Sequence, residues 1–139
     1  MINYSYQIDF TLPNNEAYSD WLSAVAIAEG YTLSEISFVF CSDEFLYNIN
    51  TNYLGHDTYT DIITFDYSQE DSLRAEIYIS IDRVRDNATT FNTTFLSELS
   101  RVMAHGVLHL CGYTDKTIEQ QIIMREKEQF YMALFVDVP

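Results

Sequence analysis

Apolar and polar residues alternate along four segments of the chain, a pattern typical of β-strands with one buried face. The first predicted strand covers residues 2–10, and the second, residues 32–41, is rich in aromatic and β-branched side chains. Two further strands are predicted over residues 61–67 and 73–81. Five polar residues, 68–72, separate this last pair, so a hairpin is favoured.

Helical patterns fill the remaining chain. Asn14 or Asn15 can cap the first helix and Ser42 the second, while Thr117 and Gln120 form a capping box at the start of the last. On that last helix we expect residues 125–128 to be a solvated charged face, with apolar neighbours packing on the sheet: Met124, Phe130, Tyr131 and Leu134. The predicted helices cover residues 15–30, 43–53, 82–89 (one or two turns), 94–111 and 117–135.

Four strands and four or five helices predict an α+β fold, and 139 residues suit a single domain over residues 1–139. The composition is 47% hydrophobic and 15% aromatic, which argues against disorder. No apolar run approaches the roughly 20 residues of a membrane span. The first ten residues lack a signal-peptide pattern, and two cysteines, Cys41 and Cys111, are too few for a disulfide framework. We therefore expect a cytoplasmic protein without a membrane segment.

The net charge narrows the choice of partners. Seven Lys and Arg against 21 Asp and Glu give a formal charge of −14. This balance opposes non-specific attraction to a phosphate backbone, so any nucleic-acid function has to overcome it.

The segment 105–115 carries the most specific chemistry. His105 and His109 lie four residues apart in a predicted helix, so both rings project from one face and can bind the same metal ion. Gly112 can end the helix and turn the chain so that Asp115 returns as a third ligand, leaving a coordination position open, as in catalytic zinc sites. Gly106 lets a strand or a substrate approach closely.

Two alternatives compete with a catalytic zinc site. Two histidines at this spacing also arise by chance, with one buried and one on the surface. A zinc protease is the other alternative, but Gly106 occupies the position of the glutamate of the HExxH proteases, which argues against it. Cys111 follows His109 by two residues, points elsewhere on a helix, and is interpreted as a core thiol.

These residues resemble the YbeY family of metal-dependent endoribonucleases linked to ribosomal RNA maturation. Residues 105–113 match every specified position of the family pattern H-G-x-L-H-L-x-G-Y-D-H up to its tyrosine. Residues 60–65 are similar to the family's T-D-V-L-S-F strand, and residues 75–80 to its G-D-I-x-I-S strand. The similarity covers about residues 35–130.

The resemblance implies a mixed four-stranded sheet packed by about five helices, with the metal site at the end of a central helix. It implies one zinc ion held by His105, His109 and Asp115, although another divalent metal stays open. The implied activity is cleavage of single-stranded RNA in ribosomal RNA processing, with ribosomal particles or proteins as partners. No residue is assigned as a general acid or base, and the oligomeric state is left open.

Two positions depart from the family pattern. Asp115 replaces the family's third histidine and Thr114 its aspartate, which keeps a ligand but lowers the charge of the site. Leu54 stands where the family has an arginine that stabilises charge during cleavage. His56 and Arg74 are possible substitutes, but a loop histidine and a solvated strand-edge charge are the favoured interpretations.

Two aspartates frame the third predicted strand. Asp61, within the family-like segment, is a candidate for a supporting contact near the metal ligands, and Asp66 is interpreted as a solvent-facing residue. Because of Leu54 and the charge, two other functions stay open: a metal-binding, ribosome-associated factor with weak or no nuclease activity, and a zinc hydrolase of a non-RNA substrate.

Overall fold

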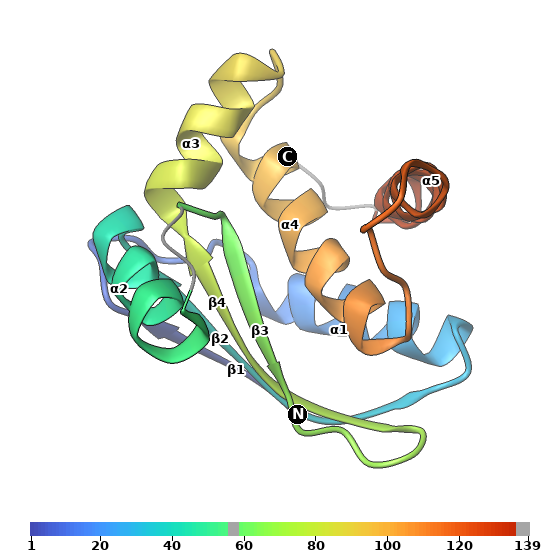
Figure 1. Ribbon diagram of the computed structural model, residues 1–139. Coiled ribbons are helices and arrows are strands. Elements are labelled where there is room, and N and C mark those ends of the chain that lie inside the picture. The colour runs from blue at the N-terminus through green and yellow to red at the C-terminus, as the bar shows by residue number, and fades with distance from the viewer. Residues whose placement is uncertain (56–58, 136–139) are drawn as a thin grey trace.

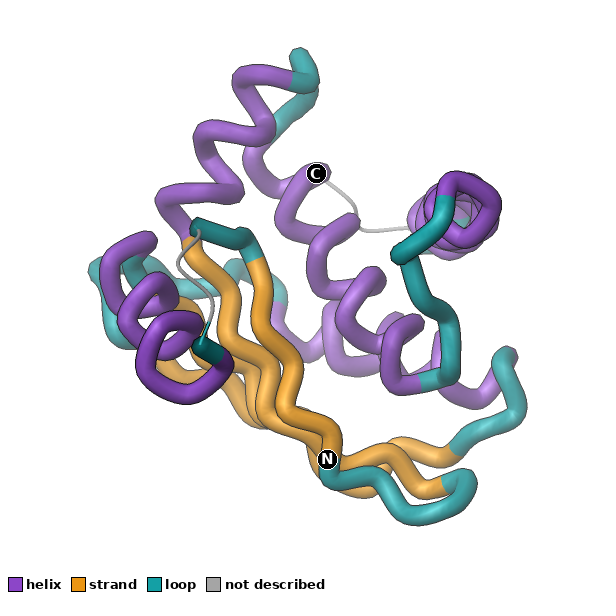
Figure 2. The backbone as a smooth tube through the Cα atoms, in the orientation of Figure 1, coloured by secondary structure: helices purple, strands orange, loops and turns teal. Residues whose placement is uncertain are grey.

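The computed structural model describes residues 1–55 and 59–135. Within these ranges the chain forms four strands and five helices (Figures 1 and 2). In chain order they are β1 (Ile2–Tyr6), α1 (Asn15–Ala28), β2 (Thr32–Cys41), α2 (Asp43–Leu54), β3 (Ile62–Asp66), β4 (Ser72–Ser80), α3 (Ile81–Thr90), α4 (Phe95–Leu110) and α5 (Ile118–Ala133).

The strands form one mixed sheet in the order β1-β2-β4-β3. β1 pairs with β2 and β2 with β4 in parallel, while β3 runs antiparallel to β4 as the predicted hairpin. The α+β class, the four-stranded mixed sheet and the five helices are thus confirmed.

Side-chain alternation in β2 separates two cores. Ile36, Phe38 and Phe40 point into the main core, where α1, α3, α4 and α5 contribute their buried faces. Cys41 points the opposite way and packs with Leu46 of α2 in a smaller cluster on the other face of the sheet. α4 lies in the middle of the larger helical layer, between α1, α3 and α5 (Figure 1).

Three local expectations are wrong. β1 ends at Tyr6 because the chain bends just after it, where the Phe10 amide donates to the Ile8 carbonyl at 2.8 Å. Asn14 precedes α1 with a left-handed backbone (φ 51°) and makes no capping hydrogen bond with its side chain. Phe130 of α5 and Leu134, just after the helix, are exposed, whereas Met124 and Tyr131 of α5 are buried.

The predicted capping residues of the later helices do act as caps. The side chains of Ser42 and Thr117 accept hydrogen bonds from the first turns of α2 and α5, and Thr117 with Gln120 completes the capping box. Thr94, which was not predicted as a cap, does the same for α4. Cys111 lies in the main core, where burial raises the pKa of its thiol to about 12. Among the described residues, none of the helices combines the length and apolarity needed to cross a bilayer.

Candidate metal centre

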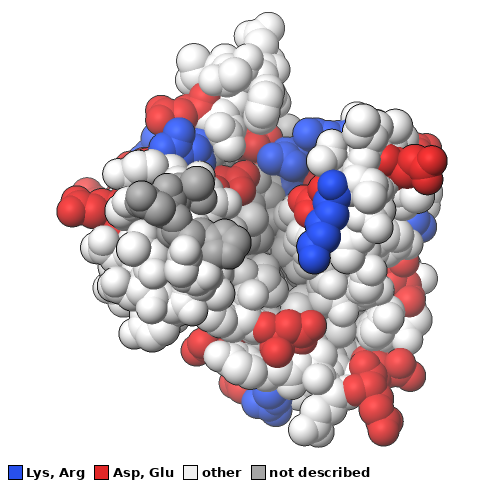
Figure 3. Space-filling model, in the orientation of Figure 1, with Lys and Arg blue, Asp and Glu red and all other residues white. Residues whose placement is uncertain are grey.

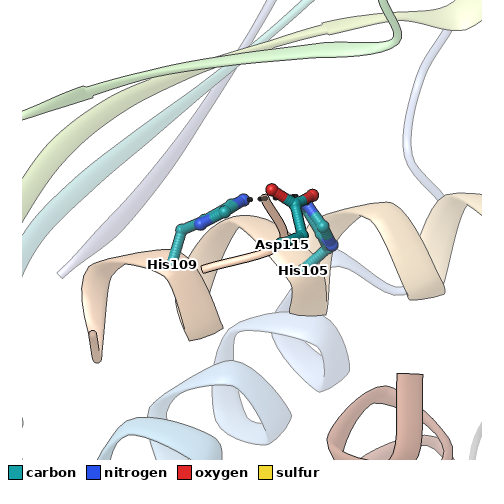
Figure 4. Close-up of side chains that lie close together, drawn as sticks. All are labelled: His105, His109 and Asp115. Carbon is teal, nitrogen blue, oxygen red and sulfur yellow. Dashed lines mark ion pairs between the residues drawn. The ribbon is translucent and has the colours of Figure 1, made fainter. Parts of the chain in front are cut away.

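Three side chains from the last turns of α4 and the loop after it converge on one point (Figure 4). Nε2 of His105 lies 3.4 Å, and Nε2 of His109 3.8 Å, from Oδ2 of Asp115. Tetrahedral coordination with bonds of about 2.0–2.1 Å separates ligand atoms by roughly 3.3 Å. The structure therefore brings together all three candidate ligands, and a small closure of the side chains would accommodate one divalent ion.

Hydrogen bonds on the far side of each ring fix which nitrogen faces the cluster. Nδ1 of His105 lies 2.7 Å from Oε2 of Glu128, and Nδ1 of His109 lies 2.8 Å from the carbonyl oxygen of Tyr113. A carbonyl and an ionised carboxylate can only accept, so each Nδ1 donates its proton and each Nε2 keeps a free lone pair. This is the tautomer that metal coordination through Nε2 requires.

The ionisation state of His109 also suits a ligand. Burial lowers the pKa of His109, and the nearby His105 lowers it further. A neutral imidazole is the form that binds a metal ion, because its lone pair is free. The donor set is two imidazoles and one carboxylate, which fits zinc and other borderline divalent metals.

The C-terminal end of α4 returns the chain toward the two histidines. Gly112 has a φ of 100°, a left-handed conformation that glycine adopts without steric cost. The Gly112 amide donates to the His109 carbonyl at 3.0 Å and the Tyr113 amide to the Leu108 carbonyl at 3.1 Å, the two bonds of a Schellman motif. The reversal places the Tyr113 carbonyl on His109 and carries Asp115 back over the helix.

Gly106 sits where α4 packs most closely on the sheet. A Cβ atom at this position would lie 3.0 Å from Cδ1 of Ile62 and 3.2 Å from Cδ1 of Ile77. The glycine therefore serves the close approach of a strand, one of the two reasons its sequence position suggests. The close packing at Gly106 thereby sets the distance between the neighbouring His105 and the strands β3 and β4.

Glu128 contradicts the expectation of a solvated face over residues 125–128. It is only 1% exposed and contacts His105 from α5. Its position follows from helical spacing, since Met124, Glu128 and Tyr131 lie on one buried stripe. Burial alone would raise the pKa of Glu128, but the hydrogen bond from His105 and the charge of Arg101 outweigh burial and hold that pKa below its ordinary value.

Arg101 is a second residue that the sequence did not single out. Its guanidinium bonds both oxygens of Glu98, at 2.9 and 2.7 Å, and Oε1 of Glu128 at 3.1 Å. Glu98 is itself only 2% exposed. Paired in this way, Arg101 keeps Glu128 ionised and holds it against His105.

Asp61 lies beside this network, just before β3. Its Oδ2 is 3.9 Å from Nη2 of Arg101, and burial raises its pKa although Arg101 opposes that shift. Asp66, at the other end of the strand, is exposed and accepts a bond from the Ser68 amide at 2.8 Å. The solvent-facing interpretation of Asp66 is confirmed, whereas Asp61 lies near the ligands.

A cleft of about 590 Å³ opens between α4 and α5 beside these side chains. Figure 3 shows this face of the molecule hollowed, with Lys and Arg side chains gathered on the α5 side of the hollow. The cleft is lined by Asp61, Arg101, Val102, His105, Asp115, Ile118, Gln121, Ile122, Met124, Arg125, Glu126 and Glu128.

Of the two suggested substitutes for the arginine expected at Leu54, the structure describes only Arg74, and it does not fill that role. Leu54 is 44% exposed at the end of α2. Arg74 is exposed and pairs with Glu35 at 2.9 Å, as expected for a solvated strand-edge charge. His56 lies outside the described residues.

Comparison with known proteins gives one consistent result. A family model described as endoribonuclease YbeY matches residues 4–136. Curated proteins of that name include one from Flavobacterium johnsoniae, 49% identical over 135 residues, with 97% of each chain covered. One from Amoebophilus asiaticus is 51% identical over 126 residues, covering 90% of this chain and 86% of the relative.

A solved structure shares the fold. The solution structure of a Thermotoga maritima protein superposes with a TM-score of 0.69 at 27% identity and covers 97% of this chain and 89% of that one. The match extends over β1 and α1, beyond residues 35–130, where the sequence resemblance was identified.

Proposed function

This chain belongs to the family of endoribonuclease YbeY, and from that premise we propose that it is a metal-dependent endoribonuclease. The proposed substrate is single-stranded RNA, and the proposed process is maturation of ribosomal RNA on ribosomal particles. We place this activity in the cytoplasm and in one domain that spans residues 1–139.

One observation carries the proposal: two histidine Nε2 atoms and a carboxylate oxygen converge at the end of α4 with their lone pairs facing one another. We assign His105, His109 and Asp115 as metal ligands and zinc as the metal. When bound, such an ion polarises a water molecule toward hydroxide near neutral pH and offsets negative charge on a scissile phosphate. The cleft beside the ligands offers the space in which an RNA strand can reach them.

The remaining residues of the site act through position. Glu128 holds the Nδ1 proton of His105, the Tyr113 carbonyl holds that of His109, and Arg101 keeps Glu128 ionised. Asp61 lines the same cleft and lies close to Arg101, which in turn is bonded to Glu128. We assign it a supporting role, in orienting groups near the ligands rather than in binding the ion.

Metal analysis and cleavage together test the proposal. Purified protein should carry about one equivalent of zinc by mass spectrometry, and His109→Ala should lose it while remaining folded by circular dichroism. The zinc-loaded protein should cut single-stranded RNA, and His105→Ala should not. Full metal retention by His109→Ala would overturn the ligand assignment, and equal cutting by both proteins would point to a contaminating nuclease.

Leu54 supports a second candidate, a ribosome-associated factor with weak or no nuclease activity. No arginine stands at this position to stabilise charge developing at the phosphate, and the chain carries a net charge of −14. Co-sedimentation with ribosomal subunits without cleavage of their RNA would favour this candidate. If neither binding nor cleavage occurs, a zinc hydrolase of a non-RNA substrate is the better interpretation.

A further inference from the structure

The cleft beside the metal ligands concentrates scarce positive charge. The chain has only seven Lys and Arg residues against 21 Asp and Glu. Two of the seven, Arg101 on α4 and Arg125 on α5, line this cleft. The cleft therefore holds two of the chain's few cations, and their pairing decides which of them can meet an RNA strand.

Arg101 is not free to bind a substrate. Its side chain is 15% exposed, and its guanidinium is bonded to Glu98 and Glu128, with Asp61 close by. Glu98 and Glu128 accept three hydrogen bonds from its guanidinium, and with Asp61 they neutralise its charge. Its part is to hold Glu128.

Arg125 differs in both exposure and pairing. Its side chain is 52% exposed, and Nη1 lies 3.7 Å from Oε1 of Glu128, too far for a good hydrogen bond. That oxygen of Glu128 already accepts a bond from Arg101 at 3.1 Å. The guanidinium of Arg125 can therefore turn to another anion at little cost.

Arg125 determines whether the cleft carries a net negative charge when a divalent ion is bound. Asp61, Asp115, Glu126 and Glu128 contribute four negative charges, and Arg101 and Arg125 two positive ones. With one divalent cation, these formal charges sum to zero; without Arg125 they sum to −1. Ile118 and Ile122, 75% and 55% exposed, continue the same wall and offer an apolar surface to an unpaired nucleotide.

We infer that Arg125 binds a backbone phosphate of the RNA strand in the cleft and so positions the substrate beside the metal ligands. The inference rests on the proposed function. An arginine fork suits this task because it presents paired donors to phosphate oxygens and keeps its charge at every working pH. It also places on α5 a phosphate-binding cation that the α2 position Leu54 does not supply.

Steady-state cleavage of a fluorescent single-stranded RNA by the zinc-loaded protein tests the inference. We expect Arg125→Gln to raise KM about 10–100-fold with little change in kcat, as for loss of one charged hydrogen bond. The slope of log(kcat/KM) against log[KCl] should become about 0.7 less negative, the value for one phosphate contact on a single strand. Arg125→Lys should keep most of the slope because it keeps the charge.

Arg85→Gln is the matched control, because Arg85 is an exposed arginine of α3 and its loss changes the net charge equally. Unchanged zinc content in Arg125→Gln excludes an indirect effect through Glu128. The inference fails if Arg125→Gln and Arg85→Gln give the same KM and the same salt slope while wild-type protein cuts.

Fluorescence anisotropy of the same RNA at 4 °C, measured before cleavage sets in, tests the proposed nuclease function and the role of Arg125 separately. If wild-type protein binds without cutting, the proposed nuclease activity is wrong and the binding slopes still decide on Arg125. If wild-type protein neither binds nor cuts, both the function and the inference are overturned.

Discussion

The hydrogen bond between Nδ1 of His105 and Glu128 decides which ring nitrogen faces Asp115. In Glu128→Gln the amide can donate instead of accept, so the proton of His105 can move to Nε2 and block its lone pair. We expect zinc affinity to fall about 10–100-fold, the usual effect of removing such a partner. Competition titration with a chromophoric chelator measures it.

Glu126→Gln is the matched control for that experiment. Glu126 is an exposed carboxylate on the same helix that lines the same cleft, and its loss removes the same charge. If both variants weaken zinc binding equally, the effect is one of net charge and the orienting role of Glu128 is wrong. Circular dichroism should find both variants folded.

Residue by residue, the sequence revealed the parts of the site that lie close together in the chain. His105, His109 and Asp115 fall within one helix end and its turn, so helical spacing and a glycine were enough to group them. Glu128 lies 23 residues beyond His105 on a different helix, and no local pattern links them. Its place between Met124 and Tyr131 on one helical stripe was the available signal.

At the scale of the element, the end of α4 links stability to metal binding. An alanine in place of Gly112 would have to adopt a left-handed conformation, which costs roughly 1–2 kcal/mol. Relaxation of that strain would move the loop that carries Asp115. Gly112→Ala should therefore lower the free energy of unfolding by about 1–2 kcal/mol and also weaken zinc binding. Urea unfolding in chelator and zinc titration measure the two effects separately.

Gly55→Ala serves as the comparison, because Gly55 follows α2 with a φ of 69° and a Cβ atom added there would meet no other atom within 4 Å. It should lose stability without losing zinc affinity. If the two variants change zinc affinity alike, the turn after α4 does not position Asp115.

Glu29, at the end of α1, ties three segments together. It accepts bonds from Tyr113 at 2.7 Å, from Lys127 at 3.3 Å and from Tyr131. Burial would raise the pKa of Glu29, but these bonds prevail and lower it from 4.5. Because the folded pKa lies below the unfolded one, the stabilisation is complete above about pH 4.5 and is lost as the pH falls through the folded value.

Glu29→Gln should therefore flatten the acid limb of the stability curve. Urea midpoints measured in chelator from pH 7 to pH 3 should fall less steeply for this variant than for wild-type protein. Glu119→Gln, an exposed carboxylate on α5, should follow the wild-type curve. Parallel curves for all three proteins would mean that the Glu29 bonds contribute nothing that depends on pH.

Elements were predictable where local chemistry determines them. Ser42 and Thr117 mark true helix starts because a hydroxyl acceptor satisfies first-turn amides in any fold. The order β1-β2-β4-β3 was not predictable, because parallel pairs join segments far apart, such as Ile2 with Ile36. Phe130 was misplaced because an apolar residue on a helix does not by itself reveal which face is covered.

At the scale of the whole molecule, a net charge of −14 surrounds a cleft whose formal charge is zero with a divalent ion. The net charge repels RNA at long range, and only the cleft holds RNA at short range. We therefore expect the net charge to slow the association of RNA with the protein.

Neutralising carboxylates away from the cleft, as in Glu16→Gln with Asp20→Asn on α1, should raise kcat/KM about 2–3-fold at 20 mM KCl. At 0.5 M KCl, where the Debye length falls to about 4 Å, the difference should vanish. Cleavage kinetics at the two salt concentrations check this, with Arg85→Gln expected to act in the opposite direction. Equal rates for wild-type and neutralised protein at low salt would mean that the RNA senses the cleft alone.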